Sequence, residues 1–160
     1  MPFPSTPPSM LFGPERFDAP DVQALADAQQ AEMRGLYEGE GDIGPARDAA
    51  MFEPPDGLFL VGRVDGRAVA CGGVCRFDAA RGELKRMYVV PGERGLGYGR
   101  RILEALEDGA RGLGYVAIVL ETADRQAASL GLYRSAGYVP IPCYGVYAER
   151  AISRCFEKAL

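Results

Sequence analysis

The chain has 160 residues, of which 48% are hydrophobic and 25% are charged, and its formal net charge is −4. This length and composition are typical of one globular domain. The acidic balance argues against a nucleic-acid-binding protein, which would present a basic face. The chain has no histidine, so mechanisms and metal sites that depend on imidazole are excluded.

The sequence contains no run of about eighteen apolar residues, the length that crosses a membrane. Its first residues also lack the charged and apolar regions of a secretory signal. We therefore expect a cytoplasmic protein whose partners include neither a membrane nor nucleic acid. No Cys-x-x-Cys pair occurs, so the four cysteines are expected to be buried free thiols in a reducing compartment: Cys71, Cys75, Cys143 and Cys155.

Taken in chain order, residues 1–9 contain four prolines and predict an extended leader, which leaves residues 10–160 as a single domain. A first strand is predicted at 10–12. A helix is predicted to begin near Pro20, with Asp18 as its N-terminal cap. The apolar stripe of this helix follows helical spacing: Val22, Leu25, Ala26, Gln29, Met33 and Leu36.

Strands are predicted over residues 58–64 and 67–77, because Asp65-Gly66 between them is a strong hairpin signal. A third strand, 83–90, leads into a glycine-rich segment. Then follow an amphipathic helix around 102–113, a strand at 115–120, a helix at 126–136 and strands starting near 138 and 152. The order β-α-α-β-β-β-α-β-α-β-β predicts an α+β fold with a mixed, mainly antiparallel central sheet flanked by helices.

The glycine-rich segment joins the third strand to the amphipathic helix. Its glycines alternate with other residues at Gly95, Gly97 and Gly99, and Arg94 and Arg100 flank them. Glycines let backbone N–H groups approach a ligand closely, and the first turn of a helix has N–H groups without intrahelical partners. The helix dipole also favours negative charge at this end, so the segment is predicted to hold a phosphate or pyrophosphate.

Two common phosphate-binding patterns do not fit this segment. A P-loop requires Gly-Lys followed by Ser or Thr, and a dinucleotide fingerprint requires a third glycine where the chain has Ile102. The pattern Arg94-x-x-Gly97-x-Gly99, after a strand and before a helix, resembles the coenzyme A pyrophosphate loop of the GCN5-related N-acetyltransferase (GNAT) superfamily.

A second stretch, residues 127–138, supports this resemblance. Its Leu132-Tyr133-x-x-x-Gly137-Tyr138 is similar to the other recurrent GNAT pattern, and it lies in the expected order and setting. Together the two motifs identify the chain as a member of the superfamily with a GNAT-like sheet. Many members carry an asparagine just before this helix, where the chain has Asp124-Arg125-Gln126.

The resemblance implies an acetyl-CoA-dependent N-acetyltransferase that moves an acetyl group to a primary amine by direct attack, without a metal. It also implies that the loop holds the pyrophosphate and that a backbone N–H near Val89 stabilises the oxyanion. The residues expected to bind the cofactor are Val89, Val90, Arg94, Gly95, Leu96, Gly97, Tyr98, Gly99 and Arg100.

Two side chains are the expected catalytic groups. Tyr133 occupies the position that the family places beside the coenzyme sulfur, where a phenol can protonate the departing thiolate. Glu83, at the start of the strand before the loop, resembles the glutamate that deprotonates the amine in the histone-acetyltransferase branch. The alternative is that Glu83 has only a structural role and pairs with Lys85. Glu121 is the second candidate for the base, and water is the third.

The sequence leaves the acceptor open between a small amine and a peptide amine. The acidic stretch 37–42 is predicted to be a solvated connection, with an acceptor-side loop as the alternative. A homodimer is one expected assembly. A coenzyme A-binding regulatory or interaction module without catalysis is the alternative function, although the presence of Tyr133 and nearby carboxylates favours an enzyme.

Overall fold

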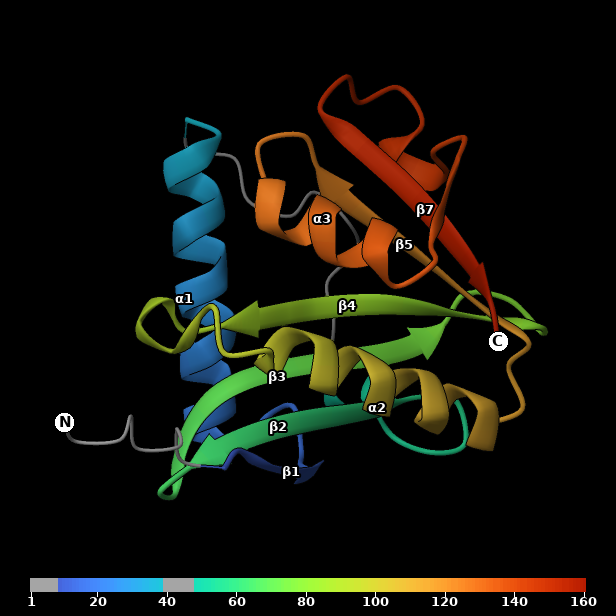
Figure 1. The fold of residues 1–160 in the computed structure, drawn as a ribbon. Coiled ribbons are helices and arrows are strands. Elements are labelled where there is room, and N and C mark those ends of the chain that lie inside the picture. The colour runs from blue at the N-terminus through green and yellow to red at the C-terminus, as the bar shows by residue number, and fades with distance from the viewer. Residues whose placement is uncertain (1–8, 39–47) are drawn as a thin grey trace, which may run out of the picture.

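The computed structural model describes residues 9–38 and 48–160, so the predicted leader lies, apart from Ser9, outside the described residues. These residues form a seven-stranded sheet and three α-helices (Figure 1). The strands are β1 (Leu11–Pro14), β2 (Leu58–Val64), β3 (Arg67–Arg76), β4 (Arg81–Val89), β5 (Ala117–Ala123), β6 (Val139–Ile141) and β7 (Ser153–Ala159). The α-helices are α1 (Pro20–Leu36), α2 (Tyr98–Gly112) and α3 (Ala127–Ser135).

The strand order in the sheet is β1-β2-β3-β4-β5-β7-β6. Neighbouring strands run antiparallel, except that β4 and β5 run parallel. Helices α2 and α3 lie on one face of the sheet, and α1 crosses the other face (Figure 1). This arrangement confirms the predicted α+β fold with a mixed, mainly antiparallel sheet.

Two apolar clusters hold the helices to the sheet, one on each face. On one face, Ile102, Leu103 and Leu106 of α2 are fully buried, and each such side chain stabilises the fold by about 1.5–3 kcal/mol. On the other face, Val22 and Leu25 of α1 are buried. Three phenylalanine rings fill the space beside α1: Phe17, Phe52 and Phe59.

The start of α1 corrects one prediction. Ala19 is the N-terminal cap residue, and no side chain caps the helix. The Asp18 carboxylate instead accepts hydrogen bonds from the Arg16 guanidinium, at 2.9 and 2.8 Å. A charged bidentate pair is stronger than a neutral cap bond, and Pro20 at the first helical position has no N–H to satisfy.

The segment between α1 and β2 also differs from the predicted element order. Where a second helix was expected, the described residues contain one 3₁₀ turn, Ala49–Phe52. Residues 39–47, which include most of the acidic stretch 37–42, lie outside the described part of the chain. The structure therefore does not test the alternative that this stretch forms an acceptor-side loop.

The cysteine prediction is half confirmed. Cys71 and Cys75 are buried free thiols on β3. Cys143 and Cys155, however, form a disulfide, with their Cα atoms 5.1 Å apart. The pairing of β6 with β7, in which Ile141 lies opposite Cys155, brings the two residues within bridging distance. The two cysteines are 12 residues apart in the sequence, and this spacing alone does not indicate that they pair.

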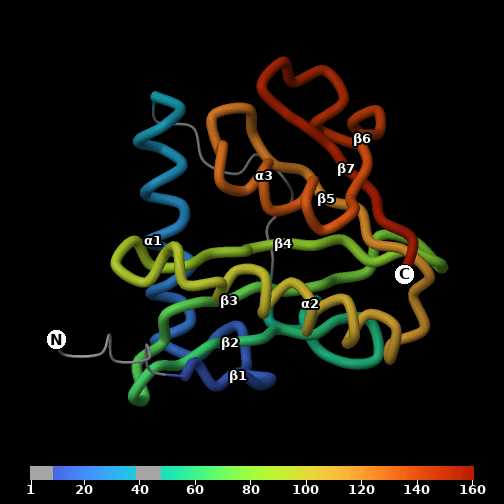
Figure 2. Tube along the Cα trace, in the orientation of Figure 1, coloured from blue at the N-terminus to red at the C-terminus, as the bar shows by residue number. Residues whose placement is uncertain are grey.

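The feature that positions the site is the divergence of β4 from β5. The two strands pair only between Arg81–Glu83 and Ala117–Val119, and then they separate (Figures 1 and 2). Beyond this point β4 contains a bulge, because its register with β3 gains one residue between Lys85 and Tyr88. Arg86 in this bulge has a φ of +61°. Bulges bend a strand, and this one turns β4 away from β5.

Candidate active site

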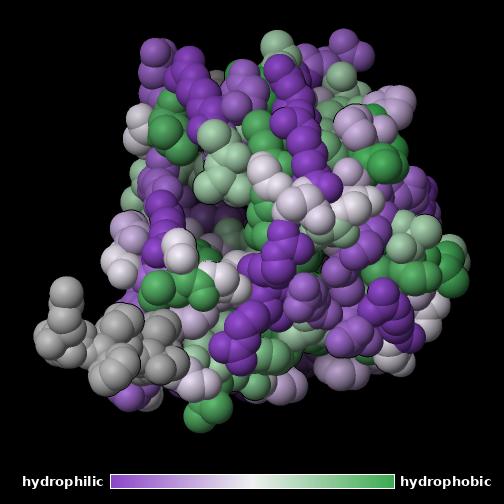
Figure 3. Space-filling view, in the orientation of Figure 1, coloured by the Kyte–Doolittle hydropathy of each residue, from purple (hydrophilic) through white to green (hydrophobic). Residues whose placement is uncertain are grey.

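A cavity of about 560 Å³ lies where β4 and β5 separate. It is lined by the C-terminal half of α1, the end of β4, the glycine-rich loop, the first turn of α2, and α3 with the segment before it. The space-filling view shows the surface hollowed between α1 and α3 (Figure 3). The predicted apolar stripe of α1 continues into this cavity, so Gln29, Met33 and Leu36 line it instead of the core.

The glycine-rich loop has the backbone conformation that an anion site requires. Gly95 has a φ of +81°, and Gly97, the N-terminal cap of α2, has a φ of +83°. A side chain at either position would be strained, although a Cβ atom would meet open space. Gly99 and Arg100 follow in the first turn of α2 and line the cavity. The helix N-terminus therefore faces the cavity and favours a phosphate group there.

The Arg94 side chain ties this loop to α1. Its guanidinium donates to both carboxylate oxygens of Glu32, at 3.1 and 2.8 Å, and its Nε donates to the Val89 carbonyl at 2.8 Å. The hydrogen bond to Glu32 raises the pKa of Arg94. Arg100 donates to the Ser135 hydroxyl. Both guanidinium groups therefore have protein partners in this structure.

Most of the residues expected to bind the cofactor come together around the cavity. Those that line it are Val89, Arg94, Gly95, Gly97, Tyr98, Gly99 and Arg100. The Tyr98 side chain itself is buried in the core. Val90 packs between the two apolar clusters, and Leu96 is 43% exposed, and neither lines the cavity.

The end of β4 offers a backbone donor to the gap between the strands. The Val90 N–H donates to the Val69 carbonyl in β3, at 2.9 Å. Successive N–H groups of a strand point to opposite sides, so the Val89 N–H points away from β3 and toward the gap. This is the geometry that the sequence analysis expected for the oxyanion donor.

Tyr133 lies on the wall between two cavities. It is 5% exposed and lines the large cavity, and it also lines a second cavity of about 70 Å³. Burial, and secondarily the negative charge of Glu121, raise the pKa of the Tyr133 phenol. The phenol is therefore protonated at neutral pH, as a proton donor must be.

The second cavity lies between α1, β4, β5, α3 and the segment before β7. Glu121 of β5 lines it, and this carboxylate accepts a hydrogen bond from the Ser153 hydroxyl at 2.9 Å. Gln29, Met33 and Met87 line both cavities, so the two spaces adjoin across these side chains. A carboxylate and a phenol thus face one small space beside the large cavity.

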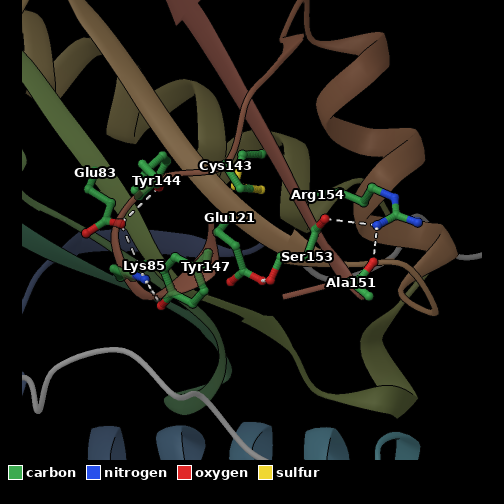
Figure 4. The surroundings of a disulfide bond; sticks show 10 residues. Glu83, Lys85, Glu121, Cys143, Tyr144, Tyr147, Ala151, Ser153 and Arg154 are labelled. Carbon is green, nitrogen blue, oxygen red and sulfur yellow. Dashed lines mark hydrogen bonds and ion pairs between the residues drawn. A yellow bond between two sulfur atoms is a disulfide. The ribbon is translucent and has the colours of Figure 1, made fainter. Parts of the chain in front are cut away.

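Glu83 is not brought to either cavity. It is buried, and its carboxylate accepts a hydrogen bond from the Tyr144 hydroxyl at 2.9 Å and lies 3.5 Å from the Lys85 ammonium (Figure 4). The Lys85 ammonium in turn donates to the Tyr147 hydroxyl at 2.8 Å. The structure therefore contains the alternative in which Glu83 pairs with Lys85, and of the two candidate bases only Glu121 lines a cavity.

Sequence reasoning did not single out several residues of the site. Glu32 holds the loop, Arg150 lines the second cavity, and Ser153 orients Glu121. The Gln29 amide donates to the Met87 carbonyl at 3.0 Å. Of these residues, only Gln29 could have been recognised from the sequence, because it is the one polar residue in the predicted apolar stripe of α1.

Among the described residues, no group of three or more cysteine, aspartate or glutamate side chains could hold a metal ion. Within the same residues, no helix is long and apolar enough to cross a membrane.

The divergent strands, the anion-binding loop and the buried tyrosine define an acyltransferase that takes its acyl group from coenzyme A. The model of the acetyltransferase (GNAT) family matches residues 22–138, and the chain belongs to this family. It is an acetyltransferase, and acetyl-CoA is its acyl donor.

One curated relative and two solved structures are similar to this chain. The IAA acetyltransferase of Azospirillum brasilense is 40% identical over 142 residues, which cover 85% of this chain and 93% of the relative. A Klebsiella pneumoniae structure, whose assignment as an acyl-CoA N-acyltransferase is itself provisional, has a TM-score of 0.80 at 28% identity, covering 94% of this chain and 97% of that one. A GNAT acetyltransferase from Elizabethkingia anophelis with acetyl-CoA bound has the same fold, with a TM-score of 0.68, 14% identity and coverage of 94% and 98%.

Proposed function

We propose that the protein transfers the acetyl group of acetyl-CoA directly to a primary amine, with Tyr133 as the general acid and Glu121 as the general base. The observation that carries this proposal is that Tyr133 lines both cavities, while Glu121 lines the small one beside it. In this arrangement the acyl donor occupies the large cavity and the amine enters through the small one.

The first task of the protein is to hold and polarise the acyl donor. When bound, acetyl-CoA supplies a thioester whose carbonyl carbon is attacked by the amine nitrogen. The loop around Gly97 and the first turn of α2 hold the pyrophosphate through backbone N–H groups. The Val89 N–H donates to the carbonyl oxygen as negative charge develops on it.

The second task is to move two protons. An alkylammonium has a pKa of about 10, so the amine must lose a proton before it attacks. Glu121 accepts that proton at the small cavity. The nitrogen loses its second proton as the tetrahedral intermediate collapses, the C–S bond breaks, and the Tyr133 phenol gives its proton to the departing thiolate. One of the two nitrogen protons then returns to the phenol and the other leaves for solvent, which returns Glu121 and Tyr133 to their starting states.

Glu83 remains an untested candidate for the base. The Tyr144 hydroxyl and the Lys85 ammonium both contact its carboxylate, and its side chain lines neither cavity. A base at this position would have to act through a chain of other groups. Glu121 needs no such chain, which is why we assign the role to it.

The proposed reaction is tested by the release of coenzyme A from acetyl-CoA in the presence of a panel of amines, followed with a thiol reagent. IAA is tested alongside the panel, because the relative from Azospirillum brasilense carries that name. We expect release that depends on an amine and an acetylated amine in equal amount. Release at the same rate with and without every amine would contradict the proposal.

Cytoplasmic location, a homodimer and a proline-rich leader at residues 1–9 stay predictions. Sedimentation of the purified chain tests the assembly, and a fluorescent fusion in cells tests the location.

A further inference from the structure

The end of β4 is hydrogen-bonded by side chains on the side that faces the gap. Among the described residues, β4 pairs with β5 only as far as Glu83, so the later backbone groups on this side have no neighbouring strand. The Met87 carbonyl instead accepts a hydrogen bond from the Gln29 amide at 3.0 Å. The Val89 carbonyl accepts one from the Arg94 Nε at 2.8 Å. Two side chains thus replace the missing strand contacts at these two carbonyls.

The Val89 N–H lies between these two carbonyls. Peptide groups of an extended strand point alternately to its two sides, and the Val90 N–H bonds to β3. The order of groups that face the gap is therefore the Met87 carbonyl, the Val89 N–H and the Val89 carbonyl. A carbonyl without a donor would turn its negative end toward the thioester oxygen as that oxygen gains charge. It would then oppose the stabilisation that the N–H supplies.

Both side-chain donors depend on α1. Gln29 belongs to this helix, and the Arg94 guanidinium is held by the Glu32 carboxylate, at 3.1 and 2.8 Å. Gln29 and Glu32 are three residues apart in the helix, so their side chains are neighbours on its surface. Figure 1 shows α1 lying across the end of β4. The helix therefore organises the part of β4 that β5 leaves without a partner.

The polar side chain of Gln29 costs stability at its position. It continues the apolar stripe of α1, and its Oε1 atom is buried without a hydrogen-bond partner among the described residues. A buried acceptor without a partner lowers the free energy of unfolding, and an apolar side chain of the same size would avoid this cost. Only the NH₂ end of the amide can donate to a carbonyl. The bond to Met87 is therefore the contact that a glutamine provides here and an apolar residue does not.

We infer that Gln29 is a positioning residue for acetyl transfer. By donating to the Met87 carbonyl, it fixes the end of β4 so that the Val89 N–H faces the thioester oxygen, and it keeps the carbonyl dipole from opposing that contact. Arg94 acts in the same way on the Val89 carbonyl. Gln29 transfers no proton itself. The inference rests on the proposed function in one respect, which is the assignment of the Val89 N–H as the oxyanion donor.

Gln29→Met removes the donor and keeps the length and flexibility of the side chain. We expect kcat to fall about tenfold, less than the roughly 10²–10³-fold that loss of an oxyanion donor itself costs. The KM for acetyl-CoA should change little, and the melting temperature should be equal or higher. Gln23→Met is the control, because the Gln23 amide of the same helix donates to the Phe17 carbonyl at 2.6 Å but lines neither cavity. An unchanged kcat in folded Gln29→Met, or an equal fall in Gln23→Met, overturns the inference.

Infrared spectroscopy of bound acetyl-CoA, isotope-labelled at the thioester carbonyl, tests the same contact without any acceptor. A stronger hydrogen bond weakens the C=O bond, so we expect a lower stretching frequency in the wild type than in buffer. The lowering should be smaller in Gln29→Met and complete in Gln23→Met. Equal lowering in the wild type and Gln29→Met overturns the inference, and no lowering in the wild type overturns the Val89 donor with it. Failure of every amine, with the expected infrared pattern, overturns the proposed transfer to an amine and leaves this inference standing.

Discussion

Tyr133 and Glu121 line the same small cavity, and the negative charge of the Glu121 carboxylate adds to burial in raising the pKa of the Tyr133 phenol. The two residues come from α3 and β5, beside the gap that the divergence of β4 and β5 opens. The Glu121 carboxylate therefore supports the protonated state that Tyr133 needs as a proton donor, because a nearby negative charge keeps the phenol neutral.

Removal of the Tyr133 hydroxyl tests the proton donor. We expect Tyr133→Phe to lower kcat about 10²-fold, at the low end for loss of a general acid, because water replaces part of the donor. The KM for acetyl-CoA should change little, and the retained ring should preserve the fold. Tyr138→Phe is the control, since its ring lies 5.7 Å from that of Tyr133 but lines neither cavity. Equal kcat in wild type and Tyr133→Phe, where chemistry limits turnover, would leave Tyr133 a core residue.

A pair of glutamate variants distinguishes the two candidate bases. Glu121→Gln should lower kcat/KM at neutral pH by about 10²-fold, and higher pH should recover much of this loss by supplying free amine. Glu83→Gln should leave the shape of the pH–rate profile unchanged and lower the free energy of unfolding, because the buried Lys85 loses its ion pair. The opposite pattern, with the altered profile in Glu83→Gln, would return the role of base to Glu83.

The loop conformation predicts a strong effect of a side chain at Gly97. Binding of coenzyme A should raise the melting temperature, because the ligand binds only the folded state. Gly97→Val should abolish this rise, since a β-branched residue is strained at a φ of +83° and would distort the anion site. Gly92→Ala is the control, because Gly92 has no positive φ and its Cβ would meet open space. A full ligand shift in Gly97→Val would contradict the assignment of the loop.

The Cys143–Cys155 bridge predicts both a thiol count and a stability change. In denaturant without reductant, two thiols should titrate, and four after reduction. Replacing both bridge cysteines by serine should lower the free energy of unfolding by about 3 kcal/mol, the value expected for a loop of this length. Chemical denaturation measures this change. Four reactive thiols in the unreduced denatured chain would show that the bridge does not form.

Burial of Cys71 predicts a loss of stability in alkaline solution. Burial raises the pKa of the Cys71 thiol from 9.0 to about 12, so the unfolded chain releases this proton at lower pH than the folded chain. The stabilising contribution is therefore complete below pH 9 and is lost as the pH rises toward 12. Urea unfolding at pH 8, 9 and 10 should show a declining free energy, by up to about 1.4 kcal/mol per pH unit for one proton. Cys71→Ala should flatten the decline, and an equal slope in the variant would contradict the assignment.

Local signals in the sequence determined the order of most elements and the anion-binding loop. The hairpin at Asp65-Gly66 and the alternating Gly95, Gly97 and Gly99 act over a few residues, because turn dihedrals and helix starts depend on neighbouring side chains. The Tyr133 position also followed from a local pattern. These predictions needed no knowledge of which strands pair.

Only the tertiary structure decided which charged groups face the site. Glu83 and Glu121 lie on neighbouring strands and share one face of the sheet, yet Tyr144 and Lys85 cover the first while the second borders the cavity. The same holds for the Cys143–Cys155 bridge, which depends on the pairing of β6 with β7. Such contacts join residues far apart in the chain, and charge, burial and bridging act through space, so no local pattern of residues encodes them.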